Sequence, residues 1–144
     1  MIRAVVDTNV SVSGFISPLS HPREIERRWR RAEFVLVTSR DIVEEVSRVL
    51  HLPRIMRKYH VTEADVEAFV LALVNKSSYV AERLALGGVA PDPGDDKIIA
   101  CAVAGPADFI VTGDKPLQRV GEFRGIRIID AGAFIGVLGE KQDL

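Results

Sequence analysis

The chain has 144 residues, of which 47% are hydrophobic, and its formal net charge is −1. This length suits one domain with an apolar core, so we expect a single domain over residues 1–144. The only cysteine, Cys101, excludes an internal disulfide, and no Cys and His spacing typical of a zinc site occurs. The net charge does not exclude nucleic-acid binding, because the charge of a local basic patch can be offset by acidic residues elsewhere.

The expected location of the protein follows from segments that the sequence lacks. The chain begins directly with a strand-like pattern, and no basic and apolar secretory leader precedes it. No run approaches the roughly twenty apolar residues of a membrane span. Together with the lone cysteine, these features predict a cytoplasmic protein that does not enter a membrane.

Apolar runs alternate with helical patterns along the chain. The runs that we interpret as strands are 2–7, 34–37, 108–111 and 126–129, with a weaker one near 78–81. The helices that we predict are 22–32, 40–52 (ended by Pro53), 63–76, 95–104 and 131–138. Strands that alternate with helices indicate right-handed crossovers and an α/β fold, with a mainly parallel sheet covered on both faces.

Two acidic residues follow predicted strands. Asp7 ends the first strand, and Asp114 follows the strand at 108–111 across the turn Thr112-Gly113. Open parallel sheets bind their ligands beyond the carboxyl ends of the strands, which makes both residues candidates for a functional site. Each also has a simpler interpretation, Asp7 as a turn residue and Asp114 as the cap of a short helix.

Helix geometry singles out two further acidic residues. A rotation of about 100° per residue places Glu45 at the edge of the apolar face of its helix and Glu44 nearly opposite. The same rotation places Asp95 near the centre of an apolar face and Asp96 toward its edge. The alternatives are an exposed pair of glutamates and, for Asp95, a helix N-cap.

Asp7, Glu45, Asp95 and Asp114 together are called the four acidic residues below. If they converge at one edge of the sheet, their charges repel one another unless a multivalent cation neutralises them. Carboxylate oxygens suit hard cations that keep some of their waters. The pattern therefore favours a metal site.

Basic residues gather around the single tryptophan. Five arginines surround Trp29, namely Arg23, Arg27, Arg28, Arg30 and Arg31. Cations interleaved with an aromatic ring can hold phosphates and stack a base, which makes Arg27, Arg28 and Arg31 candidate substrate-binding residues. The alternative is a solvated helix whose Trp29 packs in the core or on another subunit.

Two other groups of residues have simple interpretations. The histidines, His21, His51 and His60, lie among charged or polar residues, and we interpret them as surface residues. The apolar face of the helix at 63–76 indicates either ordinary core packing or an interface with a second copy or with a small antitoxin protein.

The segments that carry the acidic residues resemble PIN-domain nucleases, and more closely the toxin-like PIN proteins of prokaryotic toxin–antitoxin systems. The matching segments are VVDTNV at 5–10, SRDIVEEVSRVL at 39–50 and DPGDDKIIACAVAGPADFIVTGDKPL at 92–117. The resemblance spans about residues 2 to 130. One departure is Pro-Leu-Gln after Asp114-Lys115, where the family often has an acidic residue followed by two apolar residues.

The resemblance implies a three-layer α/β/α sandwich and the cleavage of RNA. It implies that Mg²⁺ or Mn²⁺ is bound by Asp7, Glu45, Asp95 and Asp114, which are then both metal ligands and catalytic residues, and it places Asn9, Thr112 and Asp96 as polar residues near the site. Such a cation activates water and stabilises charge on the attacked phosphate, so no histidine base is needed. A toxin of this kind implies a small antitoxin protein as partner, and a homodimer is compatible with it.

Two other function classes stay open. A magnesium-dependent phosphatase also has an aspartate at the end of its first strand, but such enzymes usually have a second aspartate two residues later, where this chain has Asn9. A PIN-like RNA-binding or assembly module with weak or no catalysis is the other alternative, and the presence of all four acidic residues argues against it. No glycine-rich phosphate loop follows the first strand, which disfavours nucleotide-cofactor enzymes.

Overall fold

The computed structural model describes residues 1–82 and 93–142 of the chain. Their centre is a six-stranded sheet in the order β3-β2-β1-β4-β6-β5. The strands are β1 (Arg3–Val6), β2 (Val35–Ser39), β3 (Ser78–Val80), β4 (Phe109–Val111), β5 (Glu122–Phe123) and β6 (Ile126–Ile129). β5 is antiparallel to β6, and the neighbours from β3 through to β6 pair in parallel.

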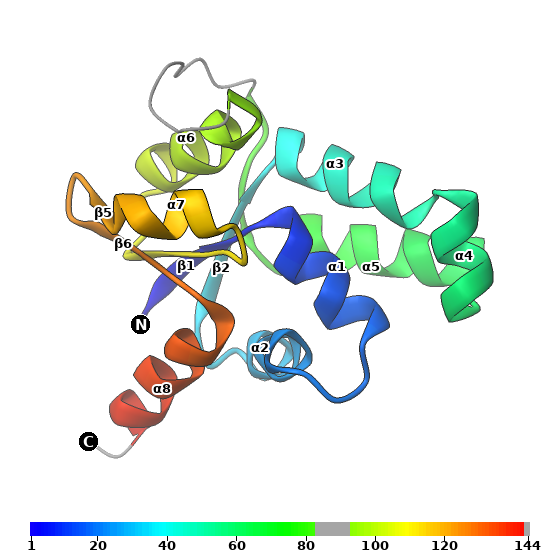
Figure 1. Cartoon of the computed structure of the whole chain (residues 1–144), viewed down its shortest axis with the longest axis horizontal. Coiled ribbons are helices and arrows are strands. Elements are labelled where there is room, and N and C mark those ends of the chain that lie inside the picture. Colours follow the sequence, from blue (N-terminus) through cyan, green and yellow to red (C-terminus); the bar gives the residue numbers. More distant parts are fainter. Residues whose placement is uncertain (83–92, 143–144) are drawn as a thin grey trace.

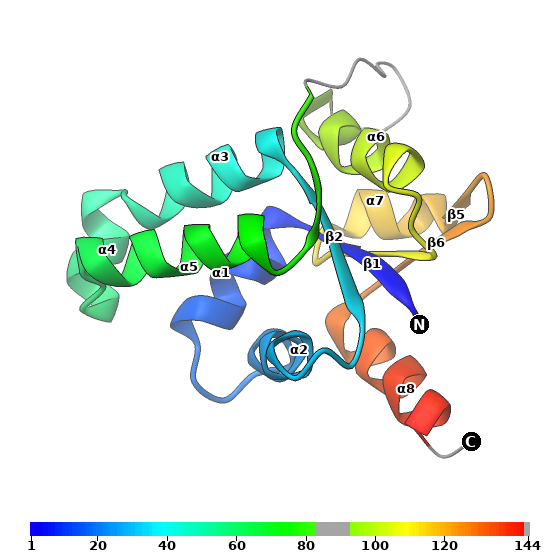
Figure 2. The same ribbon diagram turned by 180° about the vertical axis from the view of Figure 1, so that it is seen from behind.

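Helices cover the sheet and extend to one side of it. They are α1 (Thr8–Ile16), α2 (His21–Arg30), α3 (Arg40–Leu50), α4 (Pro53–Tyr59), α5 (Glu63–Asn75), the 3₁₀ turn η1 (Pro93–Asp95), α6 (Asp96–Ala104), α7 (Lys115–Val120) and α8 (Ala131–Gln142). Figure 1 shows α6 above the strands and α2 and α8 below them. Figure 2 shows the same arrangement from behind, with α3, α4 and α5 projecting sideways. The predicted α/β fold with a mainly parallel sheet covered by helices is confirmed.

All five predicted strands appear, and the central strands β1 and β4 were visible because a strand buried on both faces must be apolar at every position. In β1, Ala4, Val5 and Val6 are all buried, and β4 ends in the fully buried Ile110 and Val111. The short edge strand β5 was not predicted, since its two residues give no pattern.

Three helices differ from the prediction. α1 was missed because its sequence TNVSVSGFI is rich in residues that disfavour helix interiors. Pro53 does more than end α3, because it occupies the first position of a new helix, α4, where proline costs no hydrogen bond. Asp95 does not lie within α6 but ends the 3₁₀ turn that precedes it.

Trp29 lies in the core, which contradicts the base-stacking interpretation of this residue. Its side chain is 6% exposed, and its ring packs edge-on against Phe69 at a centroid distance of 6.4 Å. The indole Nε1 donates a hydrogen bond to the carbonyl oxygen of Lys76 at 2.8 Å. A buried indole with its only donor satisfied is a structural anchor.

The apolar face of α5 packs into the same core. Val66, Phe69 and Leu73 are buried there, which favours core packing over an interface for this face. Within residues 1–82 and 93–142, no helix is both long enough and apolar enough to cross a membrane.

Candidate functional site

Asp7 and Thr112 face each other at the carboxyl ends of two adjacent strands. β1 and β4 pair in parallel, with Val6 opposite Val111, so the next residue of each strand lies at the same edge of the sheet. The Asp7 amide continues this ladder by donating to the Val111 carbonyl at 2.9 Å. β2, the next strand in the chain, lies on one side of β1, and β4 lies on the other. The strand order therefore reverses at β1, and open α/β sheets bind their ligands at the carboxyl edge of such a reversal point.

The Thr112 hydroxyl connects two of the four acidic residues. It donates to Asp7 Oδ2 at 2.7 Å and accepts from the backbone N–H of Asp114 at 3.0 Å. Thr112 is fully buried, so these two bonds hold it without competition from water. The side chain of Asp7 and the start of α7 are thereby fixed relative to each other.

Asp7 is a buried carboxylate whose charge the protein compensates only in part. Its side chain is 5% exposed, and burial is the main cause that raises its pKa above the ordinary value, with the nearby Asp114 charge raising it further. Hydrogen bonds from Thr112 and from the Thr8 backbone, and then the charge of Lys97, act in the opposite direction on this pKa. A cation bound beside Asp7 would remove the remaining cost of its charge.

Three of the four acidic residues stand at helix starts but do not cap them. Asp7, Asp95 and Asp114 occupy the N-cap positions of α1, α6 and α7, and none forms a side-chain capping hydrogen bond. Other helices of this chain are capped in the usual way, by Ser20, Ser39 and Thr62. Asp95 and Asp114 therefore occupy N-cap positions, as the simple interpretation predicts for them, but their carboxylates do not cap the helices.

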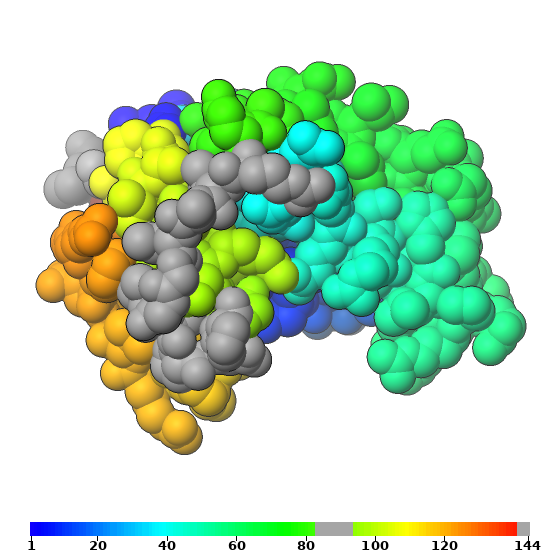
Figure 3. Space-filling model, turned by 90° about the horizontal axis from the view of Figure 1, so that it is seen from above, coloured from blue at the N-terminus to red at the C-terminus, as the bar shows by residue number. Residues whose placement is uncertain are grey.

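Glu45 and Glu44 lie in different surroundings, as the helical rotation predicts. Glu45 is 24% exposed at its side chain, and its Oε2 forms an ion pair with Nζ of Lys97 on α6. Glu44 is 50% exposed and pairs with Arg40 of its own helix at 3.3 Å. Figure 3 shows the atoms of α3 and α6 side by side, with blue atoms of the N-terminal segment beside them.

Lys97 is the site residue that the sequence analysis missed. It is half-buried, it pairs with Glu45, and its charge acts on Asp7. The available signal was a lysine directly after Asp95-Asp96, in the first turn of a helix whose other face is apolar. Its pairing with α3 depends on the packing of two helices that are distant in the sequence, which no local pattern reveals.

The carboxylates fit a divalent cation in their chemistry but are not assembled around one. In the described part of the chain, no three His, Cys, Asp or Glu side chains lie close enough together to hold a metal ion. Asp7 is joined to Asp114 through Thr112, and Glu45 is held by Lys97. Asp95 and Asp96 are half-buried at the start of the helix that carries Lys97. An all-oxygen donor set suits a hard cation, and the ion pair with Lys97 engages one oxygen of Glu45.

Asn9 connects α1 to the loop that carries Asp114. Its side-chain Oδ1 accepts a hydrogen bond from the backbone N–H of Gly113 at 3.2 Å, and the residue is exposed. Asn9 therefore lies beside the site and supports the turn between Thr112 and Asp114.

The candidate substrate-binding arginines lie apart from these carboxylates. Arg28 pairs with Glu24 at 3.0 Å and with Glu33 at 3.6 Å, and Arg27 also pairs with Glu24. Arg31 ends α2 and precedes the amino end of β2, which is the edge of the sheet opposite to Asp7. The structure does not bring this group together with the four acidic residues.

Comparison with known proteins gives one family match. A family model described as PIN domain matches residues 3–116, which include Asp7, Glu45, Asp95 and Asp114. No curated protein sequence matches the chain significantly.

Proposed function

The chain belongs to the PIN-domain family, whose members are generally metal-dependent nucleases, and on this premise we propose that it is a metal-dependent endoribonuclease. The observation that carries the proposal is the bond from Thr112 to the buried carboxylate of Asp7, at the point where the strand order reverses. This edge of the sheet is where an α/β fold presents its ligand-binding groups.

In this proposal the four acidic residues, Asp7, Glu45, Asp95 and Asp114, hold Mg²⁺ or Mn²⁺ and form the catalytic site. The bound cation supplies an activated water and offsets negative charge on the attacked phosphate. The protein itself positions the carboxylate oxygens. Thr112 fixes the orientation of the Asp7 carboxylate, and Asn9 supports the turn before Asp114.

The other proposed features rest on the resemblance of the three motif segments. RNA is the substrate, the cell role is that of the toxin in a toxin–antitoxin pair, and the partner is a small antitoxin protein. A short neighbouring gene that encodes a DNA-binding fold would support this role. Its absence would remove the toxin role and leave the nuclease proposal intact.

The phosphatase alternative has little support. A phosphatase of the kind considered would need an acidic residue two positions after Asp7, and the residue there is Asn9, whose Oδ1 accepts the Gly113 N–H. An amide that accepts a backbone hydrogen bond cannot act as a general acid or base.

The experiment that tests the proposal is incubation of the purified protein with a mixed set of RNAs, in Mg²⁺, in Mn²⁺ and in chelator. We expect internal cleavage in the presence of either cation and none in chelator. An Asp7→Asn variant purified in parallel controls for contaminating nucleases. Equal cleavage by the wild type and by this variant would show that the activity does not come from this site.

A further inference from the structure

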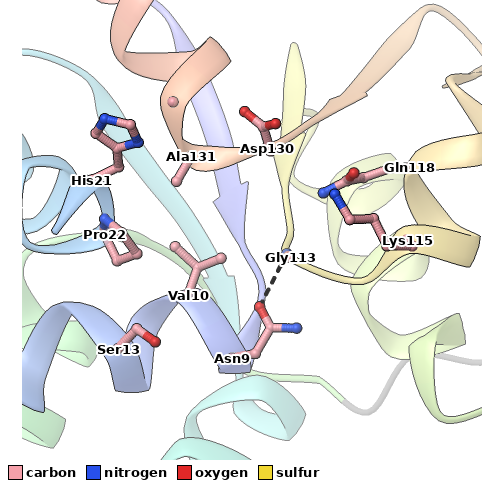
Figure 4. A pocket seen from close by; sticks show the side chains of 11 residues that line it. Asn9, Val10, Ser13, His21, Pro22, Gly113, Lys115, Gln118, Asp130 and Ala131 are labelled. Atoms are coloured by element: carbon pink, nitrogen blue, oxygen red, sulfur yellow. Dashed lines mark hydrogen bonds between the residues drawn. The ribbon is translucent and has the colours of Figure 1, made fainter. Parts of the chain in front are cut away.

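An open pocket of about 530 Å³ lies beside the carboxylates and is called the flanking pocket below. Figure 4 shows its walls, which come from α1, from the starts of α2 and α8, and from α7 with the turn before it. The polar side chains on which the inference rests are Asn9, Ser13, His21, Lys115, Gln118 and Asp130. Ligand pockets for small molecules have volumes of roughly 300–1,000 Å³, and the volume of this pocket falls within that range.

The flanking pocket begins where the acidic site ends. Asn9 and Gly113 line it, and the hydrogen bond between Asn9 Oδ1 and the Gly113 N–H forms its border with the acidic site. Gly113 lies between Thr112 and Asp114, and Asn9 is two residues after Asp7. A strand of RNA whose phosphate lies at the carboxylates therefore places a neighbouring nucleotide in this pocket.

Several polar groups in the flanking pocket keep hydrogen-bonding capacity for a ligand. The side chains of His21 and Lys115 form no hydrogen bond or ion pair with any residue in the described ranges 1–82 and 93–142. Gln118 uses its Nε2 to donate to the Thr112 carbonyl at 2.7 Å, which leaves Oε1 as an acceptor. Asp130 uses Oδ1 to accept from the Ala133 N–H at 2.8 Å, which leaves its second oxygen.

The distribution of charge gives the bound nucleotide an orientation. Lys115 follows Asp114 directly and provides a cation for a phosphate next to the acidic site. His21 and Asp130 lie at the rim opposite Asn9 (Figure 4). The carboxylate of Asp130 repels a second phosphate there, but it accepts hydrogen bonds from amino groups on a base edge. Phosphate at one end and base at the other is the arrangement that these charges favour.

We propose that the flanking pocket holds the RNA nucleotide adjacent to the scissile phosphate and selects its base through His21, Gln118 and Asp130. The inference rests on the proposed nuclease function and adds a subsite that determines sequence preference. Single-stranded RNA is commonly recognised through unstacked bases whose edges are hydrogen-bonded, and this pocket offers both donors and acceptors for such an edge.

Gly132 leaves room for the ring of His21. A Cβ at this position would lie 3.0 Å from His21 Nδ1 and 3.6 Å from Asp130 Oδ1. The ring of His21 therefore rests against the start of α8 at a distance that only glycine permits without adjustment. Gly132→Ala forces the ring to shift by a few tenths of an ångström while leaving the four acidic residues untouched, and it provides an independent variant for the test.

The test has two arms, and the first is binding without metal. The four ribonucleoside monophosphates, as 5′ and as 3′ phosphates, are titrated in chelator against the wild type, Lys115→Gln and Arg119→Gln. We expect one base to bind best and Lys115→Gln to weaken all bases by about fivefold, as loss of one exposed ion pair does. Arg119 is exposed on the same helix outside the pocket, so its variant is the charge-matched control. Comparison of 5′ with 3′ phosphates shows on which side of the scissile bond the nucleotide lies.

The second arm is the base preference of cleavage. A random RNA pool is cut in Mn²⁺, and the bases at the new ends are sequenced for the wild type, His21→Ala, Gly132→Ala and Asp130→Asn. Asparagine keeps an oxygen that can cap α8, so the last variant preserves the helix start while it changes the acceptor. We expect the preferred base to change or its preference to fall by about tenfold, the discrimination of one good pair of hydrogen bonds.

Two results would overturn the inference, and a third concerns only the nuclease proposal. Unchanged end sequences in all three cleavage variants contradict base selection by this pocket. Equal nucleotide affinity in Lys115→Gln and Arg119→Gln contradicts the phosphate position. If the wild type cleaves no RNA in metal, the nuclease proposal fails, and the binding arm still decides whether the pocket takes a nucleotide.

Discussion

The ammonium group of Lys97 on α6 forms an ion pair with Oε2 of Glu45 on α3. This pair joins two helices whose starts both lie at the carboxyl edge of the sheet, and the same ammonium charge acts on Asp7. Lys97 thus supplies positive charge to both carboxylates. Under the proposed function, a divalent cation that binds Glu45 competes with this internal charge.

Replacing Lys97 with Met should strengthen the binding of Mn²⁺. The variant removes the competing ammonium group, and a partly exposed ion pair is worth roughly 1 kcal/mol, which corresponds to about a fivefold change in affinity. The metal-free variant should also melt at a lower temperature, because the acidic residues lose a counter-charge. Calorimetric titration and melting curves measure the two effects.

Lys76→Met is the control for the loss of a lysine charge, because the Lys76 side chain is exposed and the residue makes its structural contacts through its backbone, whose oxygen accepts from Trp29. Lys97→Arg keeps the charge and should behave like the wild type. Weaker Mn²⁺ binding by Lys97→Met would show instead that Lys97 assists the site when metal is bound.

Asp7→Asn should abolish cleavage and stabilise the metal-free protein at neutral pH. Burial raises the pKa of Asp7, so the folded state binds the Asp7 proton more tightly than the unfolded state does. Ionised Asp7 therefore costs stability. This cost grows as the pH rises from about 3.8, the ordinary pKa of an aspartate, through the raised pKa of the folded state. Asparagine keeps an oxygen for the Thr112 hydroxyl and carries no charge.

The check is a comparison of melting temperatures in chelator at several pH values. The stability advantage of Asp7→Asn over the wild type should be present at pH 7 and should vanish below about pH 3.8. An advantage that is independent of pH would mean that the charge of Asp7 is not its cause.

Thr112→Val should separate the role of the hydroxyl from that of the side-chain shape. Valine fills a similar space but can neither donate to Asp7 nor accept from the Asp114 N–H. We expect a loss of about 1–3 kcal/mol of stability and a further rise in the pKa of Asp7, because a hydrogen bond that lowers it is removed. Thr112→Ser keeps the hydroxyl and should recover most activity. Denaturant unfolding measures the loss of stability, and the pH–rate profile measures the change in pKa. Equal behaviour of the Val and Ser variants would show that the hydroxyl has neither role.

Glu45→Gln should cost orders of magnitude in cleavage rate, whereas Glu44→Gln should be nearly silent. The first residue borders the acidic site, and the second pairs with Arg40 on the exposed side of the same helix. Asp95→Asn is expected to behave like Glu45→Gln, and Asp96→Asn to be intermediate. Single-turnover cleavage and metal-dependent melting shifts of the four variants measure this. An essential Glu44 with a dispensable Glu45 would contradict the assignment.

The sequence predicted those features that depend on local pattern. The central strands β1 and β4 were visible because buried parallel strands are apolar throughout, and the different exposure of Glu44 and Glu45 followed from helical rotation alone. α1 escaped prediction because packing against α2 and α3, rather than its own propensity, supports it.

The features that the sequence did not reveal depend on contacts between distant segments. The partner of Trp29 is the backbone of Lys76, and the partner of Lys97 is Glu45. The flanking pocket likewise brings together the starts of α2 and α8, where His21 meets Gly132. The histidine was interpreted as a surface residue, and it is exposed, but its position in the flanking pocket could not be read from its neighbours in the chain.

The most direct measurement of the central claim is single-turnover cleavage of one defined RNA at increasing Mn²⁺ concentration, by the wild type and by Asp7→Asn. We expect the wild-type rate to rise with Mn²⁺ to a plateau and to disappear in chelator, and we expect no measurable rate for the variant at any concentration. Cleavage by the wild type at the same rate in chelator, or cleavage by Asp7→Asn with the same dependence on Mn²⁺, would contradict a metal-dependent site built on Asp7.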